Sequence, residues 1–320
     1  MLVIGAGVIG LSTGVLLAER LGARVEIVAA ELPQATTSAA ATGMCGPVFR
    51  GPDERAVRWE LATVSHLSEL ADAEPAAGVR WATGLAAAPA GMGSAPPLAD
   101  ESALVRLADP DELPAGFAFG MWMRIPLVDL PIYLRYLADR FAAAGGRLRQ
   151  GRVDALAGAA ERAPVLVNCT GVGAAALCAD RELRPVRGQQ VVVANPGLEG
   201  FFMPAPGASE WASWHAHGDH VLLGGVALDG DRDARPAPEI AAGIIERCAR
   251  LEPRLAGATV IGHRAGLRPA RPRARLEVEV IGSSRCVHQY GHGSVGVLQS
   301  WGSALEAVEL VGGRSPAAAG

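Results

Sequence analysis

The first sixty residues contain a glycine pattern that can bind a phosphate group. Residues 5–10 read Gly-Ala-Gly-Val-Ile-Gly, a G-x-G-x-x-G pattern, between an apolar run at 2–4 and a stretch with helical spacing. Glycines there let the backbone approach a pyrophosphate, which the N-terminus of the following helix stabilises. Glu31 follows a second predicted strand at 24–29, where a carboxylate can bind ribose hydroxyls. The pattern predicts dinucleotide binding, and it does not distinguish FAD from NAD.

Two further segments have the small and hydroxyl-bearing residues that line a cofactor. Residues 36–44 read TTSAAATGM, which can run along a flavin with backbone and hydroxyl donors. The apolar run at 165–167 leads into Asn-Cys-Thr-Gly at 168–171, where a predicted strand ends. Taken alone, each segment is equally an ordinary loop or turn, so neither identifies the cofactor.

The C-terminal third concentrates arginines and glycines. Residues 263–277 read HRAGLRPARPRARLE, and a planar guanidinium can bind a carboxylate through two parallel hydrogen bonds. The residues alone do not select among Arg264, Arg268, Arg271, Arg273 and Arg275. Residues 290–297 read YGHGSVGV, a turn that can bind an anion before a helix predicted to begin near Val297. His292 in this turn is a candidate base, but a histidine in such a turn is more often structural.

Composition excludes several classes of chemistry and partner. The 320 residues include no lysine, so Schiff-base chemistry through lysine is excluded. Five cysteines are scattered without a C-x-x-C pair, which argues against a disulfide framework or zinc site and favours a reducing cytoplasm. A net charge of −4 gives no sign of a nucleic-acid or membrane partner. The uncharged N-terminal run is better explained as strand, turn and helix than as a membrane span.

The order of the predicted elements indicates the fold class. After the N-terminal βαβ unit come two helices at 55–70 and 129–144, a loop at 85–97, and strands at 147–156, 185–194 and 221–227. The last two strands have no helical crossover between them, which predicts a largely antiparallel sheet. This order indicates an α/β nucleotide-binding domain interleaved with an α+β domain, with the substrate between the two.

Together these segments resemble the FAD-dependent D-amino acid oxidases and D-aspartate oxidases. The matching segments follow the family's order and leave only the middle third poorly matched: VIGAGVIGLSTG at 3–14, TTSAAATGM at 36–44, VNCTGVGA at 167–174, RPVRGQ at 184–189, GLRPARPRARLE at 266–277, YGHGSVGV at 290–297 and WGSALEA at 301–307. The resemblance implies a Rossmann-like FAD-binding domain interleaved with an α+β substrate domain on a largely antiparallel sheet. The FAD-binding domain would comprise residues 1–45, 139–186 and 266–320, and the substrate domain residues 46–138 and 187–265.

The resemblance also implies a reaction. A neutral D-amino acid would transfer a hydride from its α-carbon to non-covalently bound FAD, which dioxygen reoxidises. The products would be a 2-oxo acid, ammonia and hydrogen peroxide. The alternatives are an amine oxidase for glycine, sarcosine or a specialised amino acid, and a flavin-binding protein without turnover. We expect a cytoplasmic protein without a metal, and a homodimer is one assembly to consider.

Site residues follow from the resemblance by position. Arg268, in GLRP, matches the carboxylate-binding arginine, and no acid or base residue is implied. Trp214 best matches the aromatic pocket tyrosine, although Trp211 also fits, and Ser294 replaces a glycine whose carbonyl meets the substrate amine. The implied cofactor-binding residues are Gly5, Ala6, Gly7, Val8, Ile9, Gly10, Glu31, Thr36, Thr37, Ser38, Gly43, Met44, Val153, Cys169, Thr170, Gly171, Gly293, Ser294, Val295, Gly296, Val297 and Leu298.

Some positions depart from the family, and they affect substrate choice. Ala30 stands where the family has an acid, and Glu31 is its expected substitute. Leu298 replaces a hydroxyl residue that faces the flavin. An acidic substrate side chain would need a second cation opposite Arg268, and Arg50 is the one candidate that the sequence offers. We therefore predict a preference for neutral, apolar D-amino acids over D-aspartate and D-glutamate.

Overall fold

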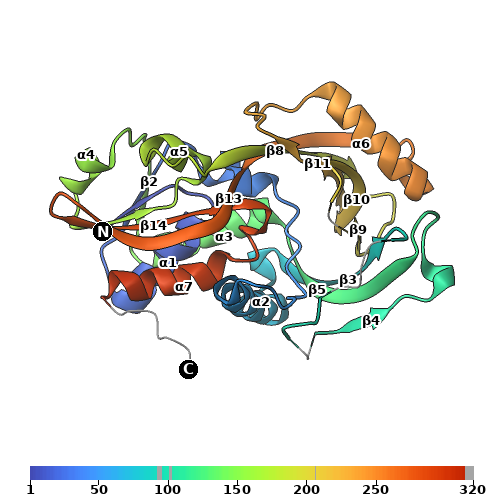
Figure 1. Ribbon diagram of the computed structural model, residues 1–320, viewed down its shortest axis with the longest axis horizontal. Helices are drawn as coiled ribbons and strands as arrows, with labels where there is room; N and C mark the ends of the chain where they lie inside the picture. The colour runs from blue at the N-terminus through green and yellow to red at the C-terminus, as the bar shows by residue number, and fades with distance from the viewer. Residues whose placement is uncertain (92–95, 101–102, 206, 314–320) are drawn as a thin grey trace.

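The computed structural model describes residues 1–91, 96–100, 103–205 and 207–313. In these residues one continuous sheet of 14 strands runs through the molecule, with helices packed against it (Figure 1). The strand order is β4-β5-β3-β9-β10-β11-β8-β13-β14-β7-β1-β2-β6, and β12 pairs with β8. The sheet has a parallel half and a mainly antiparallel half, which meet at β13 and β14.

The parallel half contains the predicted βαβ unit and is covered on both faces. Its strands, each parallel to the next, are β14 (Ser284–His292), β7 (Val165–Asn168), β1 (Leu2–Ile4), β2 (Glu26–Ala29) and β6 (Arg147–Gln150). One face packs on the helices α1 (Val8–Leu21), α3 (Leu130–Ala143) and α7 (Ser300–Val311). The other face packs on the short helices α4 (Leu156–Ala160) and α5 (Ala174–Leu177). Because both faces are covered, Leu2, Val3 and Ile4 are all buried.

Glycine lets α1 lie close to the sheet and to α3. A Cβ atom on Gly14 would lie 2.7 Å from Cδ1 of Ile27 and 3.3 Å from a ring carbon of Phe141. The helix ends at Gly22, whose φ of 57° is left-handed and favours glycine. The N-terminal run is therefore strand, turn and helix, as predicted. No helix in the described part of the chain is long and apolar enough to span a bilayer.

The second half is largely antiparallel, as the sequence predicted, and β3 and β9 are its one parallel pair among the described residues. Its strands are β4 (Val105–Leu107), β5 (Phe119–Val128), β3 (Val79–Ala88), β9 (Phe201–Pro204), β10 (Glu210–His217), β11 (His220–Val226), β8 (Arg184–Ala194) and β13 (Val260–Ile281), with the short β12 (Leu228–Asp229) beside β8. Helix α6 (Pro238–Leu251) covers one face of β8, β10 and β11 through Ile244 and Cys248. Helix α2 (Glu54–Ala73) packs against α7, where Arg55 and Trp59 both bond the carboxylate of Glu306.

Three local predictions need correction. The prediction of a loop at 85–97 is wrong for residues 85–88, because these residues belong to β3 and pair with β5 and β9. Residues 92–95 of that predicted loop lie outside the described part. The strand expected at 147–156 ends at Gln150, and Leu156 begins α4. The helix expected near Val297 begins at Ser300, after a 3₁₀ turn.

The chain passes between the two halves without a separate linker. The predicted boundary between residues 138 and 139 falls inside α3, and the one between 265 and 266 falls inside β13. β13 pairs with β8 along its first part and with β14 along its last part. The proposed domain limits stay predictions, and this shared strand is the element that joins the two halves.

Candidate active site

The predicted phosphate-binding glycines lie where β1 ends and α1 begins. Gly5 has a φ of 112°, and its N–H donates to the carbonyl of Val28 at 2.8 Å. A Cβ atom on Gly5 would overlap with the carbonyl of Cys169, and one on Gly10 would overlap with the carbonyl of Gly5. This close approach of three backbone segments needs glycine at both positions. It forms a cradle at the N-terminus of α1.

The N-terminus of α1 has the donors that a phosphate needs. The first N–H groups of any helix have no partner within the helix, and they carry its positive dipole end. Here the N–H of Val8 donates to Oγ of Ser38 at 3.0 Å, so the hydroxyl-rich segment meets this helix end. A Cβ atom on Gly7 would come within 3.0 Å of the same hydroxyl oxygen. The cradle therefore fits the pyrophosphate of a dinucleotide.

Other predicted cofactor residues border this cradle. The N–H of Cys169 donates to the carbonyl of Ile4 at 2.8 Å, and Thr170 bonds Asn168 through its hydroxyl. Gly171 has a φ of 56°, as a sharp turn after β7 requires. Glu31, by contrast, is exposed after β2.

The hydroxyl-rich segment also touches β13. The hydroxyl of Thr37 accepts a hydrogen bond from the N–H of Leu267 and lies equally close, at 3.3 Å, to the carbonyl of that residue. A Cβ atom on Gly266 would lie 3.1 Å from Thr37, so glycine permits this contact. Thr37 thereby joins the cofactor cradle to the strand that carries Arg268.

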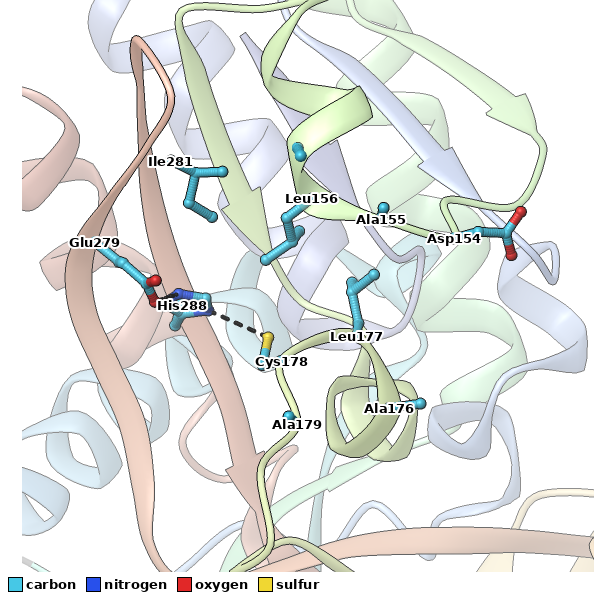
Figure 2. A pocket seen from close by; sticks show the side chains of 11 residues that line it. Asp154, Ala155, Leu156, Ala176, Leu177, Cys178, Ala179, Glu279, Ile281 and His288 are labelled. Carbon is cyan, nitrogen blue, oxygen red and sulfur yellow. Dashed lines mark hydrogen bonds and ion pairs between the residues drawn. The ribbon is translucent and has the colours of Figure 1, made fainter.

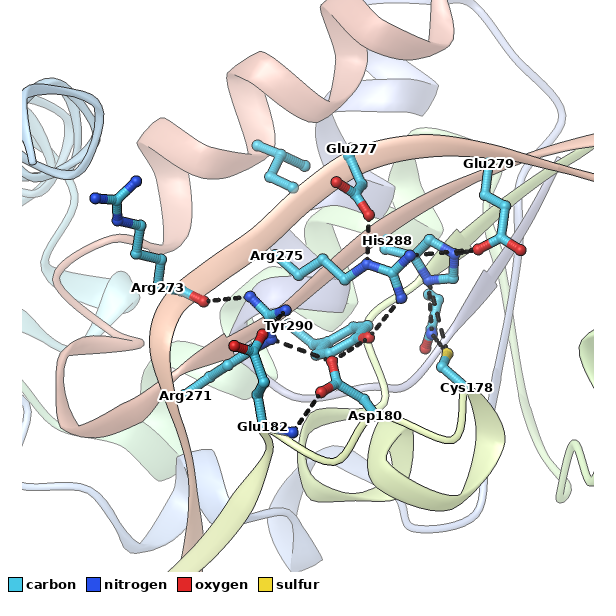
Figure 3. A network of polar contacts seen from close by, with 12 residues as sticks. Cys178, Asp180, Glu182, Arg271, Arg273, Arg275, Glu277, Glu279, His288 and Tyr290 are labelled. Atoms are coloured by element: carbon cyan, nitrogen blue, oxygen red, sulfur yellow. Dashed lines mark hydrogen bonds and ion pairs between the residues drawn. The ribbon is translucent and has the colours of Figure 1, made fainter.

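The arginines of β13 differ in their ion-pair partners, and this difference distinguishes the candidates for binding a substrate carboxylate. Arg271 forms ion pairs with Asp180 at 3.1 Å and Glu182 at 2.5 Å, and Arg275 bonds Glu277 at 2.6 Å (Figure 3). Arg273 is exposed. Arg271 and Arg275 are thus already neutralised by carboxylates. Neither is free to bind a substrate anion.

Arg268 has no carboxylate partner in the described structure. Its guanidinium donates to two backbone carbonyls, those of Val226 at 3.1 Å and Arg187 at 3.4 Å. It lies directly over Gly188, where a Cβ atom would come within 2.6 Å of the guanidinium carbon and both terminal nitrogens. Burial lowers the pKa of Arg268, yet arginine stays charged. A partly buried cation without a carboxylate partner favours binding of an anion.

Strand pairing determines which side chains share the face of Arg268. The guanidinium of Arg268 lies over Gly188 of β8. Because side chains alternate along a strand, Arg268 lies on the face of the sheet opposite to Val191 and Val193, which pack on α6. Trp214 packs on the α6 face and stacks on Phe202 at 4.8 Å. Because side chains alternate along β10, Trp214 lies on the face opposite to Arg268, so its place in a substrate pocket beside Arg268 stays a prediction that the strand pairing does not support.

The alternative, Trp211, lies on the face of Arg268. Its indole N–H donates to Oγ of Ser213 at 3.1 Å, and its ring would meet a Cβ atom on Gly225 at 2.9 Å. The next side chain after Ser213 on this face is that of His215, which was not among the predicted site residues. His215 is fully buried and stacks on Phe201 at 6.0 Å, and neither of its ring nitrogens has a hydrogen-bond partner in the part of the chain that the structure describes. Its place within WASWHAHG was visible in the sequence, but the face was not.

Two further polar groups lie on this face: Gln190, which was not predicted, and Arg264, which was one of the five candidate arginines. Gln190 is opposite Arg264 in the pairing of β8 with β13. Oε1 of Gln190 and Nη1 of Arg264 are both buried and have no hydrogen-bond partner among the residues that the structure describes. Arg50, the second cation suggested by the sequence, is instead exposed and donates to the carbonyl of Leu98.

The C-terminal glycine turn lies between β14 and α7. Gly293–Val295 form a 3₁₀ turn, in which Ser294 and Val295 are exposed, while Gly296, Val297 and Leu298 are half-buried before α7. His292 is buried, and burial lowers its pKa to about 4, so it is neutral at physiological pH. The remaining predicted residues are partly or wholly buried: Ala6, Ile9, Thr36, Gly43, Met44 and Val153.

A separate pocket of about 390 Å³ lies between α4, α5 and the β13–β14 hairpin (Figure 2). Its lining includes Cys178, whose sulfur is 3.7 Å from Nδ1 of His288, and Glu279, which is 2.9 Å from Nε2 of that ring. Burial raises the pKa of Cys178 and lowers that of His288, so both groups are neutral and do not form a thiolate–imidazolium pair. None of the predicted site residues lines this pocket.

Comparison with known proteins identifies the family. Residues 1–310 match the model of the family described as FAD dependent oxidoreductase. The chain is 42% identical over 311 residues to a D-amino-acid oxidase of Rubrobacter xylanophilus, covering 97% of this chain and 95% of that protein. It is 34% identical to the D-aspartate oxidase of Homo sapiens, covering 97% and 93%. A glycine oxidase from Geobacillus kaustophilus has the same fold, with a TM-score of 0.80, 20% identity, and coverage of 99% and 95%. The cradle, the fold and these matches together show that the chain belongs to the FAD-dependent oxidoreductase family and uses FAD as its cofactor.

Proposed function

We propose that this enzyme oxidises D-amino acids to 2-oxo acids, with release of ammonia and hydrogen peroxide. The single observation that carries the proposal is Arg268, a partly buried cation without a carboxylate partner, on the strand that Thr37 joins to the cofactor cradle. A guanidinium in that setting is complementary to the α-carboxylate that all free amino acids have. The names of the relatives with 41–42% identity, both D-amino-acid oxidases, support the same substrate class.

In this mechanism the protein mainly orients the substrate. Arg268 binds the α-carboxylate, and Gly188 leaves room for its guanidinium. The positive charge of Arg268 also disfavours the ammonium form of the substrate amine, so the amine is bound neutral and no general base is required. Trp211 and Met44 are the apolar walls that we assign to the side-chain pocket. The position of Ser294 near the substrate amine stays a prediction.

The residues around the N-terminus of α1 hold FAD. Gly5, Gly7 and Gly10 let its pyrophosphate approach the helix, and Ser38 bonds the same helix end. FAD supplies the chemistry of hydride acceptance and of electron transfer to dioxygen. We further propose non-covalent attachment, a cytoplasmic location and a homodimer; the location rests on the unpaired, scattered cysteines.

Steady-state turnover tests the proposal. Purified enzyme mixed with D-alanine, D-valine or D-methionine should produce hydrogen peroxide and the 2-oxo acid in equal amounts. The L-enantiomers should give neither product. Glycine or sarcosine as the best substrate would favour the amine-oxidase alternative, which the fold shared with glycine oxidase keeps open. A yellow protein that oxidises none of these compounds would indicate flavin binding without turnover.

A further inference from the structure

A cysteine, a histidine and a carboxylate meet at the separate pocket between α4, α5 and the β13–β14 hairpin (Figure 2). Sγ of Cys178 is 3.7 Å from Nδ1 of His288, and Nε2 of that ring is 2.9 Å from Oε2 of Glu279. A nucleophile, a base and a carboxylate that orients the base, in this order, form the arrangement of a catalytic triad. These three side chains have no part in the proposed oxidation of D-amino acids.

Two neighbours determine which nitrogen of His288 carries the proton. The amide nitrogen of Asn168 can only donate a hydrogen bond, and it lies 3.3 Å from Nδ1, so Nδ1 is the acceptor. The carboxylate of Glu279 accepts a hydrogen bond, so Nε2 carries the proton. The lone pair of Nδ1 therefore lies on the side of the ring that faces the thiol of Cys178.

The resting pair is uncharged, which determines how the thiol can react. Burial raises the pKa of Cys178, and burial together with the charge of Arg275 lowers the pKa of His288. The thiol therefore reacts as its proton leaves, and the neutral imidazole beside it is the base that takes this proton. The carboxylates of Glu279 and Glu277 act in the opposite direction to Arg275 on the pKa of His288, so they stabilise the imidazolium formed in that step.

The surroundings of the sulfur fit an acyl group. The amide nitrogen of Asn168 lies 3.1 Å from Sγ of Cys178, which is within reach of an oxygen on a carbon bonded to the sulfur. A donor in that place stabilises the oxyanion that forms when a thiol attacks an ester. The lining of the pocket is mainly aliphatic and includes Leu156, Leu177 and Ile281 (Figure 2). Its volume of about 390 Å³ leaves room for a short acyl chain beside the sulfur.

We propose that Cys178 is a nucleophile that accepts a short acyl group from an activated ester, with His288 as its base. Sγ bonds the carbonyl carbon of the ester while Nδ1 of His288 takes the thiol proton. The bond from that carbon to the leaving oxygen then breaks, and Nδ1 returns the proton to the leaving oxygen. The products are a thioester on Cys178 and the free alcohol, and the step needs no oxidant. It is a second activity, independent of the proposed oxidation.

Release of p-nitrophenol from p-nitrophenyl acetate by the FAD-loaded enzyme tests the proposal, and the chain has no lysine amines to compete. We expect release of at least one equivalent, with an acetyl group on the peptide that contains Cys178 in mass spectra of the quenched enzyme. Cys178→Ala should lose this release, whereas Cys248→Ala, which removes the buried thiol of α6, should retain it. FAD content and Tm show that both variants are folded. Equal release in Cys178→Ala, or an acetyl group on another residue, would overturn the proposal.

The pH dependence of acylation distinguishes a base from a structural histidine. In the wild type the rate of acylation should stay nearly constant between about pH 7 and 8, because the neutral imidazole takes the thiol proton. In His288→Gln only the thiolate reacts, so the rate should be lower and should rise about tenfold per pH unit over the same range. A wild-type rate that also rises tenfold per pH unit would show that the thiol reacts without His288, and it would refute the triad.

Discussion

Arg268 is set apart from the other arginines of its strand by the absence of a carboxylate partner. Arg271 and Arg275 are ion-paired, whereas Arg268 bonds only backbone carbonyls in the described structure. We expect Arg268→Ala to retain FAD and to lower kcat/KM by a factor that corresponds to about 2–4 kcal/mol of transition-state binding. This is the cost of losing a charge-assisted contact to a buried ion. Arg273→Ala, at an exposed position, should change kcat/KM far less. Equal losses in the two variants would mean that the wrong arginine has been assigned.

Gly188, on the neighbouring strand β8, supports the assignment of Arg268 as the residue that binds the substrate carboxylate. A Cβ atom there would come within 2.6 Å of the guanidinium of Arg268. Gly188→Ala should therefore displace Arg268, raise KM for D-amino acids and leave FAD bound. Gly262→Ala is the matched control, because its Cβ atom would meet Val192 at an ordinary 3.8 Å. Steady-state kinetics with D-alanine measure both variants, and a normal KM in Gly188→Ala would show that the guanidinium has another position during binding.

At the scale of elements, the sequence predicted the parts that depend on local pattern. The βαβ unit and the helices at 55–70 and 129–144 were predicted because their periodicity and glycines are local signals. The face of β10 was not predictable. Trp211 and Trp214 are three residues apart and lie on opposite faces of β10, and only strand pairing reveals which of them shares the face of Arg268. Arg264 was likewise indistinguishable from its neighbours, because the sequence does not show that its Nη1 is buried without a hydrogen-bond partner among the described residues.

The turn between β1 and α1 allows a prediction about the position of α1. A Cβ atom on Gly10 would overlap with the carbonyl of Gly5, so Gly10→Ala must move the start of α1 away from β1. We expect this variant to lose FAD and to unfold at lower temperature. Gly158→Ala, in α4, is the control, because its Cβ atom would meet nothing within 4 Å and alanine favours helix. FAD content after gel filtration and Tm are the measurements, and normal FAD binding in Gly10→Ala would contradict the cradle.

At the scale of the whole molecule, buried histidines make stability depend on pH. Burial lowers the pKa of His215 and His292 to about 4 and that of His217 to about 3. The unfolded chain binds protons at these sites below about pH 6.5, and the native state does not. The free energy of unfolding should therefore fall as pH drops from about 6.5 toward 4, by up to about 1.4 kcal/mol per histidine and pH unit.

Urea unfolding at a series of pH values measures this dependence. His292→Gln cannot titrate and should flatten the curve, whereas His263→Gln, at an exposed position, should not. A free energy of unfolding that stays constant or rises as pH falls through this range would contradict the burial of neutral histidines.

The central claim is that FAD in this protein oxidises a D-amino acid whose carboxylate is bound by Arg268. Anaerobic mixing of the FAD-loaded enzyme with D-alanine tests it most directly, because flavin reduction is seen without dioxygen or later steps. The account predicts rapid loss of the oxidised flavin absorbance with D-alanine, none with L-alanine, and much slower loss in Arg268→Ala. An oxidised spectrum that persists with a full panel of D-amino acids, or equal reduction rates in the wild type and Arg268→Ala, would contradict it.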